Sequence, residues 1–96
     1  MLIIHLQAKA RQDLHTILVD SANRWGIARA EAYYDHLTAA IQGLAEHPYL
    51  GLARDDIKAG YRQLTVQKHD VFYRVSAKKI HIIRVLHQKM YQPKHL

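Results

Sequence analysis

Residues 61–87, YRQLTVQKHDVFYRVSAKKIHIIRVLH, have the pattern of three β-strands joined by two turns. Over 61–68 a period of two places Leu64 and Val66 on one side of a strand with Arg62 and Lys68, and Tyr61, Gln63 and Thr65 on the other. The runs 71–75 and 80–87 are rich in the β-branched and aromatic side chains that strands favour. Both later runs are apolar on two faces, which predicts central strands beneath a covering layer.

These strand boundaries imply definite placements. His69-Asp70 is expected to form the first turn, and residues 76–79 the second. In the last strand we expect Ile80 and Ile82 on one face, with Ile83 and Val85 on the opposite face.

Two amphipathic helices are predicted upstream of these strands. Apolar residues recur every three or four positions over residues 14–25 and again over 27–44. Gly26 separates the two seams, and so short a link predicts an antiparallel helix hairpin. His47-Pro48 marks its end, because a residue before proline is pushed away from helical angles.

The remaining segments complete the predicted order. Residues 2–6, LIIHL, favour a first strand, and residues 48–60 favour an irregular connection because they hold Pro48 and two glycines. Residues 88–96 form a polar, basic tail. We therefore predict one α+β domain over residues 1–96, with the order β-α-α-β-β-β and an N-terminal helix hairpin packed on an antiparallel β-sheet.

Positive charge is concentrated in the second half of the chain. Residues 1–48 hold four basic and five acidic residues, whereas residues 49–96 hold ten basic and three acidic ones. A field of this kind can steer a polyanion or an acidic partner. The apolar run near the N-terminus is too short for a membrane span, and with no cysteine the chain suits a reducing cytoplasm.

Catalytic and metal-binding patterns are weak. No pair among the eight histidines has the i, i+4 spacing of a helical zinc site, and no cysteine can complete one. Ser21 and Ser76 lack the glycine context of a nucleophile elbow, and the four glycines form no phosphate-binding loop. We therefore predict no catalytic residue, no metal and no cofactor.

The candidate binding residues lie on the predicted sheet and in the tail after it. They are Arg62, Arg74, Arg84, His87, Lys89 and Tyr91. Basic and aromatic side chains on a sheet suit nucleic acid or an acidic peptide. Alternatively, Arg62 and Arg74 form ion pairs inside the fold, with Asp13, Asp20 or Asp55 as acceptors. Tyr73, an aromatic residue inside a strand, is expected in the core.

Seven short motifs occur in order along nearly the whole chain. They are A-x-x-D-L-x-x-I (10–17), R-W-G (24–26), A-x-x-Y-x-x-x-L (30–37), L-A-E-H-P-x-x-G (44–51), D-x-I-x-x-G-Y-R (55–62), H-x-V-F-Y-R (69–74) and I-x-R-V-L-H-x-x-M (82–90). Each is weak alone, but the ordered set resembles the ParE toxins of the RelE/ParE superfamily of bacterial toxin–antitoxin modules.

The resemblance implies the toxin of a type II toxin–antitoxin system, which arrests growth by binding DNA gyrase and serves plasmid or chromosome maintenance. The implied partners are gyrase and a ParD-like antitoxin whose C-terminal segment is disordered when free. We expect that segment to be acidic and partly apolar, and to cross the basic sheet and the helix seams. The resemblance implies no membrane partner and no sequence-specific nucleic-acid binding by this chain alone.

An enzymatic alternative stays open. RelE-like relatives cut messenger RNA on the ribosome, and Arg62, Arg84 and His87 match parts of such a set. Leu64 and Asp70, however, lie where the nuclease branch tends to carry basic residues, which favours the non-nuclease branch. A third hypothesis is a decayed or purely regulatory member that is not toxic.

Overall fold

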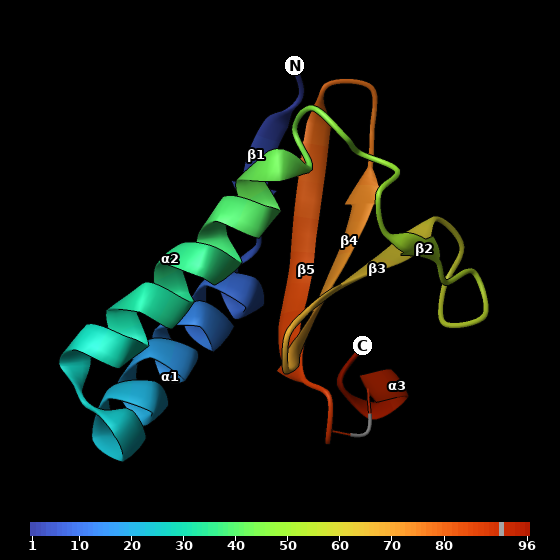
Figure 1. The fold of residues 1–96 in the computed structure, drawn as a ribbon. Coiled ribbons are helices and arrows are strands. Elements are labelled where there is room, and N and C mark those ends of the chain that lie inside the picture. Colours follow the sequence, from blue (N-terminus) through green and yellow to red (C-terminus); the bar gives the residue numbers. More distant parts are fainter. Residues whose placement is uncertain (91) are drawn as a thin grey trace.

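A helix hairpin packs against one face of a five-stranded sheet (Figure 1). A computed structural model describes residues 1–90 and 92–96. The elements in chain order are β1 (Ile3–Leu6), α1 (Ala8–Trp25), α2 (Ile27–Gly43), β2 (Leu52–Ala53), β3 (Tyr61–Val66), β4 (His69–Val75), β5 (Lys79–His87) and α3 (Gln92–His95). The predicted α+β class and the helix hairpin are confirmed.

The sheet is mixed, and this corrects the expected antiparallel sheet. The strand order is β1-β5-β4-β3-β2, and β1 runs parallel to β5 while the other neighbours are antiparallel. Two helices separate β1 from the remaining strands, so the chain can return to the sheet in either direction, and the local pattern of residues 2–6 does not specify its partner. As predicted, β4 and β5 are internal strands.

The first turn lies two residues earlier than expected. Val66 pairs with His69, so Gln67 and Lys68 form the turn, and Gln67 has a left-handed φ of 53°. His69 and Asp70 therefore belong to β4, and the predicted turn at these two residues is wrong. The turn has the expected length of two residues but a different position, and a positive φ in so short a connection matches the twist of the paired strands.

A bulge in β5 corrects the expected facing of Val85. Tyr73 pairs with Ile82 while its neighbour Phe72 pairs with Arg84, so Ile83 is an extra residue. The bulge reverses the alternation beyond it, and Val85 joins Ile82 in the core beneath the helices. A sequence pattern with period two cannot reveal such an insertion.

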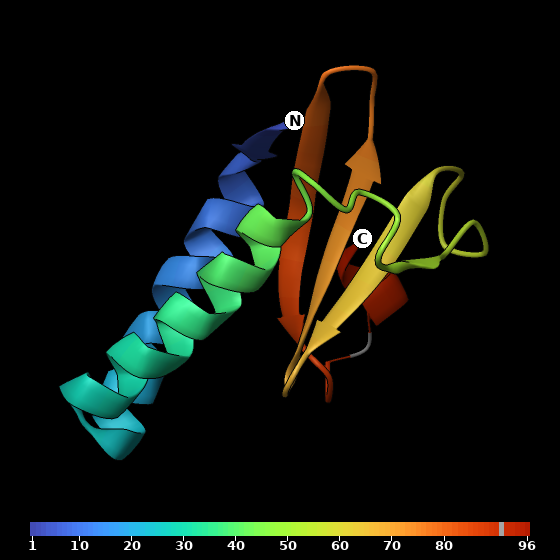
Figure 2. The ribbon, with the colours of Figure 1, turned by 45° about the horizontal axis from the view of Figure 1, so that its top comes forward.

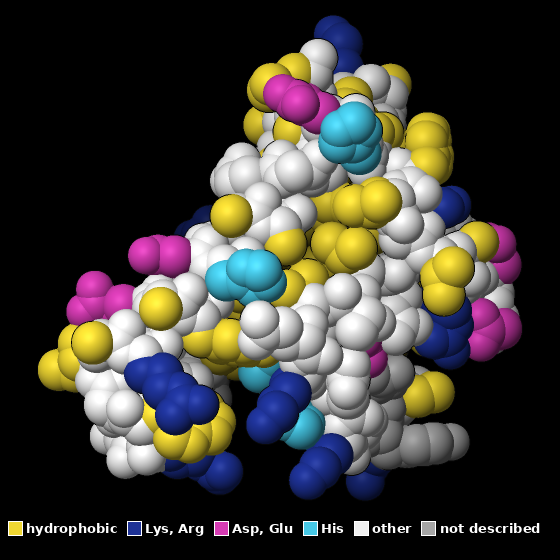
Figure 3. All heavy atoms as spheres, in the orientation of Figure 1, with side chains coloured by type: hydrophobic (Ala, Val, Ile, Leu, Met, Phe, Trp, Pro, Cys, Tyr) yellow, Lys and Arg dark blue, Asp and Glu magenta, His cyan; other side chains and the backbone are white. Residues whose placement is uncertain are grey.

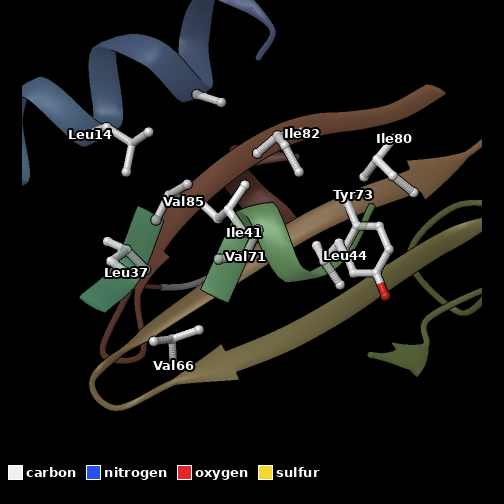
Figure 4. Packing of buried hydrophobic residues seen from close by; sticks show 11 residues of the cluster. Leu14, Leu37, Ile41, Leu44, Val66, Val71, Tyr73, Ile80, Ile82 and Val85 are labelled. Atoms are coloured by element: carbon white, nitrogen blue, oxygen red, sulfur yellow. The ribbon is translucent and has the colours of Figure 1, made fainter. Parts of the chain in front are cut away.

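The helices cover their face of the sheet with aliphatic side chains. Leu14 of α1 and Leu37, Ile41 and Leu44 of α2 pack against β4 and β5 (Figure 4). Gly26 links the helices at a φ of 88°, a left-handed value that glycine adopts without strain. The tip of the hairpin around this glycine projects away from the sheet (Figure 2).

Two short elements occupy segments that we expected to be irregular. β2 adds an edge strand within residues 48–60, and α3 forms within the C-terminal tail. The segment with α3 lies on the sheet face opposite the hairpin, where the carbonyl of His95 accepts a hydrogen bond from Arg84 (3.0 Å). In the part of the chain described, no helix combines the length and hydropathy that crossing a bilayer requires.

Candidate functional site

The predicted basic residues do not share one face of the sheet. Arg62 pairs with Tyr73, which lies in the core beneath the helices, so Arg62 projects from the helix-covered face. Arg74 pairs with His81 on the opposite face, and Arg84 projects from that face too. The single basic surface that we expected is therefore divided between two sides of the sheet.

Arg84 forms a nearly buried ion pair with Asp13 of α1. Its Nε and Nη2 donate to the two carboxylate oxygens (2.8 and 2.9 Å), and the side chains are only 16% and 15% exposed. The same carboxylate accepts from the backbone N–H of Val85 (3.0 Å), next to the bulge. The hydrogen bond to Asp13 raises the pKa of Arg84. The predicted acceptor Asp13 thus serves a different arginine, and Arg84 is held within the fold.

Arg62, in contrast, has no acidic partner among the described residues. Its Nη2 donates to the carbonyls of Gly51 (2.6 Å) and Tyr49 (3.2 Å), and its guanidinium carbon lies 5.2 Å from the centre of the Tyr49 ring. Its Nε is buried without a hydrogen-bond partner. Arg62 is therefore a cation fixed in orientation by carbonyl groups and an aromatic ring, with its charge not neutralised.

Tyr73 is buried, as predicted, and its hydroxyl anchors the loop around Arg62. Its hydroxyl donates to the Pro48 carbonyl (2.8 Å) and accepts from the Gly51 N–H (2.9 Å). Gly51 has no room for a side chain, because a Cβ there would lie 2.7 Å from the Gln63 carbonyl oxygen. We call residues 48–52 the anchored loop.

The anchored loop exposes apolar surface beside Arg62. Tyr49 and Leu50 are 68% and 63% exposed, whereas Leu52, which is 73% exposed, pairs with Gln63 and projects from the opposite face. Further hydrophobic side chains line a band between the helix hairpin and the strands (Figure 3). Exposed apolar groups around a fixed charge are the composition of a protein-binding surface.

The tip of the helix hairpin is a second exposed apolar region. Val19, Trp25 and Ile27 are exposed there, and an apolar hollow between the helices is lined by residues that include Leu18 and Ala30. The guanidinium of Arg29 lies 5.7 Å from the Trp25 ring. This tip is too far from the anchored loop along the hairpin to belong to the same site (Figure 1).

Tyr33, His69 and His87 form a cluster that sequence reasoning missed. Tyr33 Oη lies 2.6 Å from His69 Nδ1, although the residues are 36 positions apart, and the rings of His69 and His87 meet edge to face at 5.3 Å. Burial, and then the charge of His87, lowers the pKa of His69 to about 4, and burial raises the pKa of Tyr33. Both side chains are neutral at pH 7, so they join α2 to the sheet as a packed, hydrogen-bonded contact.

Two further candidates lie beyond β5. Lys89 is exposed, and its backbone N–H donates to His87 Nδ1 (3.1 Å). Tyr91 lies outside the described residues. Within the described chain, no three histidine or acidic side chains gather closely enough to hold a metal ion.

The fold is shared with chains from solved bacterial toxin–antitoxin systems. It is similar to a chain of the chromosomal ParDE system from P. aeruginosa, with a TM-score of 0.80 and 24% identity over 91% of this chain and 96% of that one. The RelBE2 toxin–antitoxin complex from Mycobacterium tuberculosis is a more distant match, with a TM-score of 0.56 and 20% identity. These likenesses concern the fold.

The sequence comparisons define the family. Residues 4–91 match the model of the ParE toxin of the type II toxin–antitoxin system parDE. The chain is 43% identical to toxin ParE1 of Caulobacter vibrioides over 95% of its own length and 94% of that protein. It is 41% identical to toxin ParE1 of Mycobacterium tuberculosis over 88% of each chain. The chain therefore belongs to the ParE toxin family of type II toxin–antitoxin systems.

Proposed function

We propose that this toxin acts in the cytoplasm by binding and inhibiting DNA gyrase, without catalysing a reaction, and that a ParD-like antitoxin neutralises it. The observation that carries the proposal is the fixed, unneutralised charge of Arg62 beside the exposed apolar side chains of the anchored loop. A surface that combines an oriented arginine with aromatic and aliphatic groups is suited to holding a protein partner.

The state of the other polar groups supports binding over catalysis. Arg84 is engaged by Asp13, and His69 is uncharged at neutral pH. General acid–base cleavage of RNA needs a group that exchanges protons near neutrality, together with a free cation that stabilises the phosphate. Of the two arginines in the alternative ribonuclease, Arg62 has no counterion among the described residues, whereas Arg84 would have to leave Asp13 to contact a phosphate.

The antitoxin segment that fits Arg62 carries a carboxylate flanked by apolar residues. Its carboxylate would pair with Arg62, and its apolar residues would cover Leu50 and the band between helices and strands. A segment that folds on such a surface buries more than about 1,000 Å². Arg74, His87, Lys89 and Tyr91 stay candidates for contacts with either partner.

A supercoiling assay tests the proposed target. Purified toxin added to gyrase and relaxed plasmid should inhibit supercoiling in proportion to its concentration. Prior mixing with the ParD-type antitoxin, expected from a short reading frame next to the toxin gene, should restore activity. Unimpaired gyrase together with cleavage of ribosome-bound messenger RNA would replace this proposal with the ribonuclease.

Growth arrest after induction of the gene alone separates the remaining alternatives. The wild-type toxin and the variant His87→Gln should both arrest growth, because binding needs no proton transfer at this position. Loss of arrest in His87→Gln, with unchanged folding and gyrase binding, would favour the ribonuclease. Continued growth with wild-type toxin would identify a decayed or regulatory member.

A further inference from the structure

A row of basic side chains crosses the sheet face opposite the helix hairpin. His5 of β1 pairs with His81 of β5, which in turn pairs with Arg74 of β4. Lys79 projects from the same face of β5, two residues before His81. We call these four residues the basic row.

The row continues over the neighbouring strand. Arg74 pairs with Tyr61 of β3, and the ammonium group of Lys58 lies 5.9 Å from the centre of the Tyr61 ring. Because adjacent strands are about 4.8 Å apart, the positive groups extend over about 15 Å of the sheet.

The fold does not neutralise this charge. The ion pairs within the described residues are those of Arg54 with Asp56 and Arg84 with Asp13, and neither includes a member of the basic row. Partial burial lowers the pKa of His81, and Arg74, His5 and Lys79 lower it further. Like charges that face each other across strands destabilise a sheet, so this arrangement has a cost in the free protein that an anion would relieve.

The polar groups at the row match the oxygens of a phosphate. Ser76 Oγ lies 3.0 Å from His81 Nε2, and the Ser76 N–H donates to the Lys79 carbonyl (2.9 Å), which holds the turn in place. Arg74, Lys79 and His5 are exposed, so a ligand can reach guanidinium, ammonium, imidazole and hydroxyl donors from one side.

We propose that the basic row binds the phosphate backbone of duplex DNA without reading its sequence. A protein partner needs an apolar centre in its interface, whereas the large exposed apolar side chains on the described strands of this face, Ile3 of β1 and Leu52 of β2, lie on the two opposite edges of the sheet. Charge without an apolar centre is the composition of a non-specific nucleic-acid contact.

A DNA contact on this face is compatible with the proposed function. Gyrase holds duplex DNA, and a toxin bound to gyrase through the anchored loop presents the opposite face of its sheet to that DNA. A role of the contact in gyrase inhibition therefore rests on the proposed function, whereas the affinity of the isolated toxin for DNA does not.

Fluorescence anisotropy of the intact toxin with a labelled 20-base-pair duplex of arbitrary sequence tests the row directly. The double variant Arg74→Gln/Lys79→Gln removes two cations of the row. Arg24→Gln/Lys68→Gln is the matched control, because it removes one exposed arginine and one exposed lysine elsewhere. The row variant should bind at least about 10-fold more weakly at 50 mM salt, and its salt slope, in log–log form, should be about two units shallower.

The control variant should keep most of the wild-type affinity and slope. Equal losses in the two variants would overturn the proposal in favour of a general charge effect, as would no binding by the wild type at 50 mM salt. Polyglutamate that displaces the toxin at lower concentration than an equally charged competitor duplex would assign the row to an acidic protein instead.

Acid should strengthen the contact. A bound phosphate favours the protonated form of His81, against its partial burial and the repulsion from Arg74, His5 and Lys79, so affinity should rise from pH 8 to pH 6. The variant His81→Gln should lose most of this rise, and an unchanged pH profile would argue against the row. DNA binding without gyrase inhibition would support the basic row as a DNA contact but contradict the proposed role at gyrase. Gyrase inhibition without DNA binding would support the gyrase proposal and contradict the DNA contact.

Discussion

Arg84 and Arg62 occupy opposite faces of one sheet and have opposite roles. Arg84 donates two hydrogen bonds to Asp13, which also binds the backbone of the bulge, so the arginine links α1 to β5. Arg62 is also fixed in orientation, but by carbonyl oxygens and the Tyr49 ring, which leave its charge without a counterion. The difference shows that a basic residue becomes a candidate for partner binding when the fold orients it without neutralising it.

The largest expected effect comes from breaking the structural pair. Asp13→Ala leaves Arg84 nearly buried and unpaired, and it removes the acceptor of the Val85 N–H. We expect the free energy of unfolding, measured in urea, to fall by about 3 kcal/mol.

An exposed ion pair provides the control for that substitution. Asp56 accepts from Arg54 at the surface, so Asp56→Ala should leave the urea midpoint nearly unchanged. Similar losses of stability in Asp13→Ala and Asp56→Ala would show that burial of the Arg84 pair has no special weight.

Reversal of the charge at Arg62 should separate affinity from stability. Arg62→Glu places a carboxylate where the proposed antitoxin segment has its own, so affinity measured by calorimetry should fall by about 30-fold or more. Arg62→Met loses the hydrogen bonds to the Gly51 and Tyr49 carbonyls but also removes the buried Nε that has no partner, so the unfolding free energy should change by only about 1 kcal/mol. If Arg62→Glu kept full affinity for the antitoxin at low salt, Arg62 would not be part of the antitoxin interface.

The contrast between the two arginines also marks the limit of sequence reasoning. Helix periodicity and strand composition predicted the hairpin, the internal strands and the core position of Tyr73. The bulge at Ile83 and the parallel pairing of β1 depend on tertiary contacts, and the bulge decides which face Arg84 occupies. The sequence also identified Asp13 as an acceptor but could not assign it to Arg84, which lies 71 positions away.

The anchored loop provides a third test. Tyr73→Phe keeps the buried ring but removes the hydroxyl that binds Pro48 and Gly51, so the unfolding free energy should fall by about 2 kcal/mol. If the loop presents Arg62 to the antitoxin, affinity should fall as well, although residue 73 lies beneath the surface. Tyr34→Phe is the matched control, because the hydroxyl of Tyr34 makes no hydrogen bond in the described structure. Unchanged affinity in Tyr73→Phe would mean that the loop need not be rigid.

The smallest effect concerns the histidine next to these regions. His69 has a pKa of about 4 in the folded chain, below the ordinary value of 6.5, so protonation favours the unfolded state. Its contribution is therefore complete above pH 6.5 and is lost as the pH falls from 6.5 towards 4. Allowing for solvent screening, we expect about 1–2 kcal/mol over that range in urea titrations. His69→Asn should flatten the decline, whereas exposed His36→Asn should not, and parallel curves for the three proteins would mean that His69 titrates as it does in water.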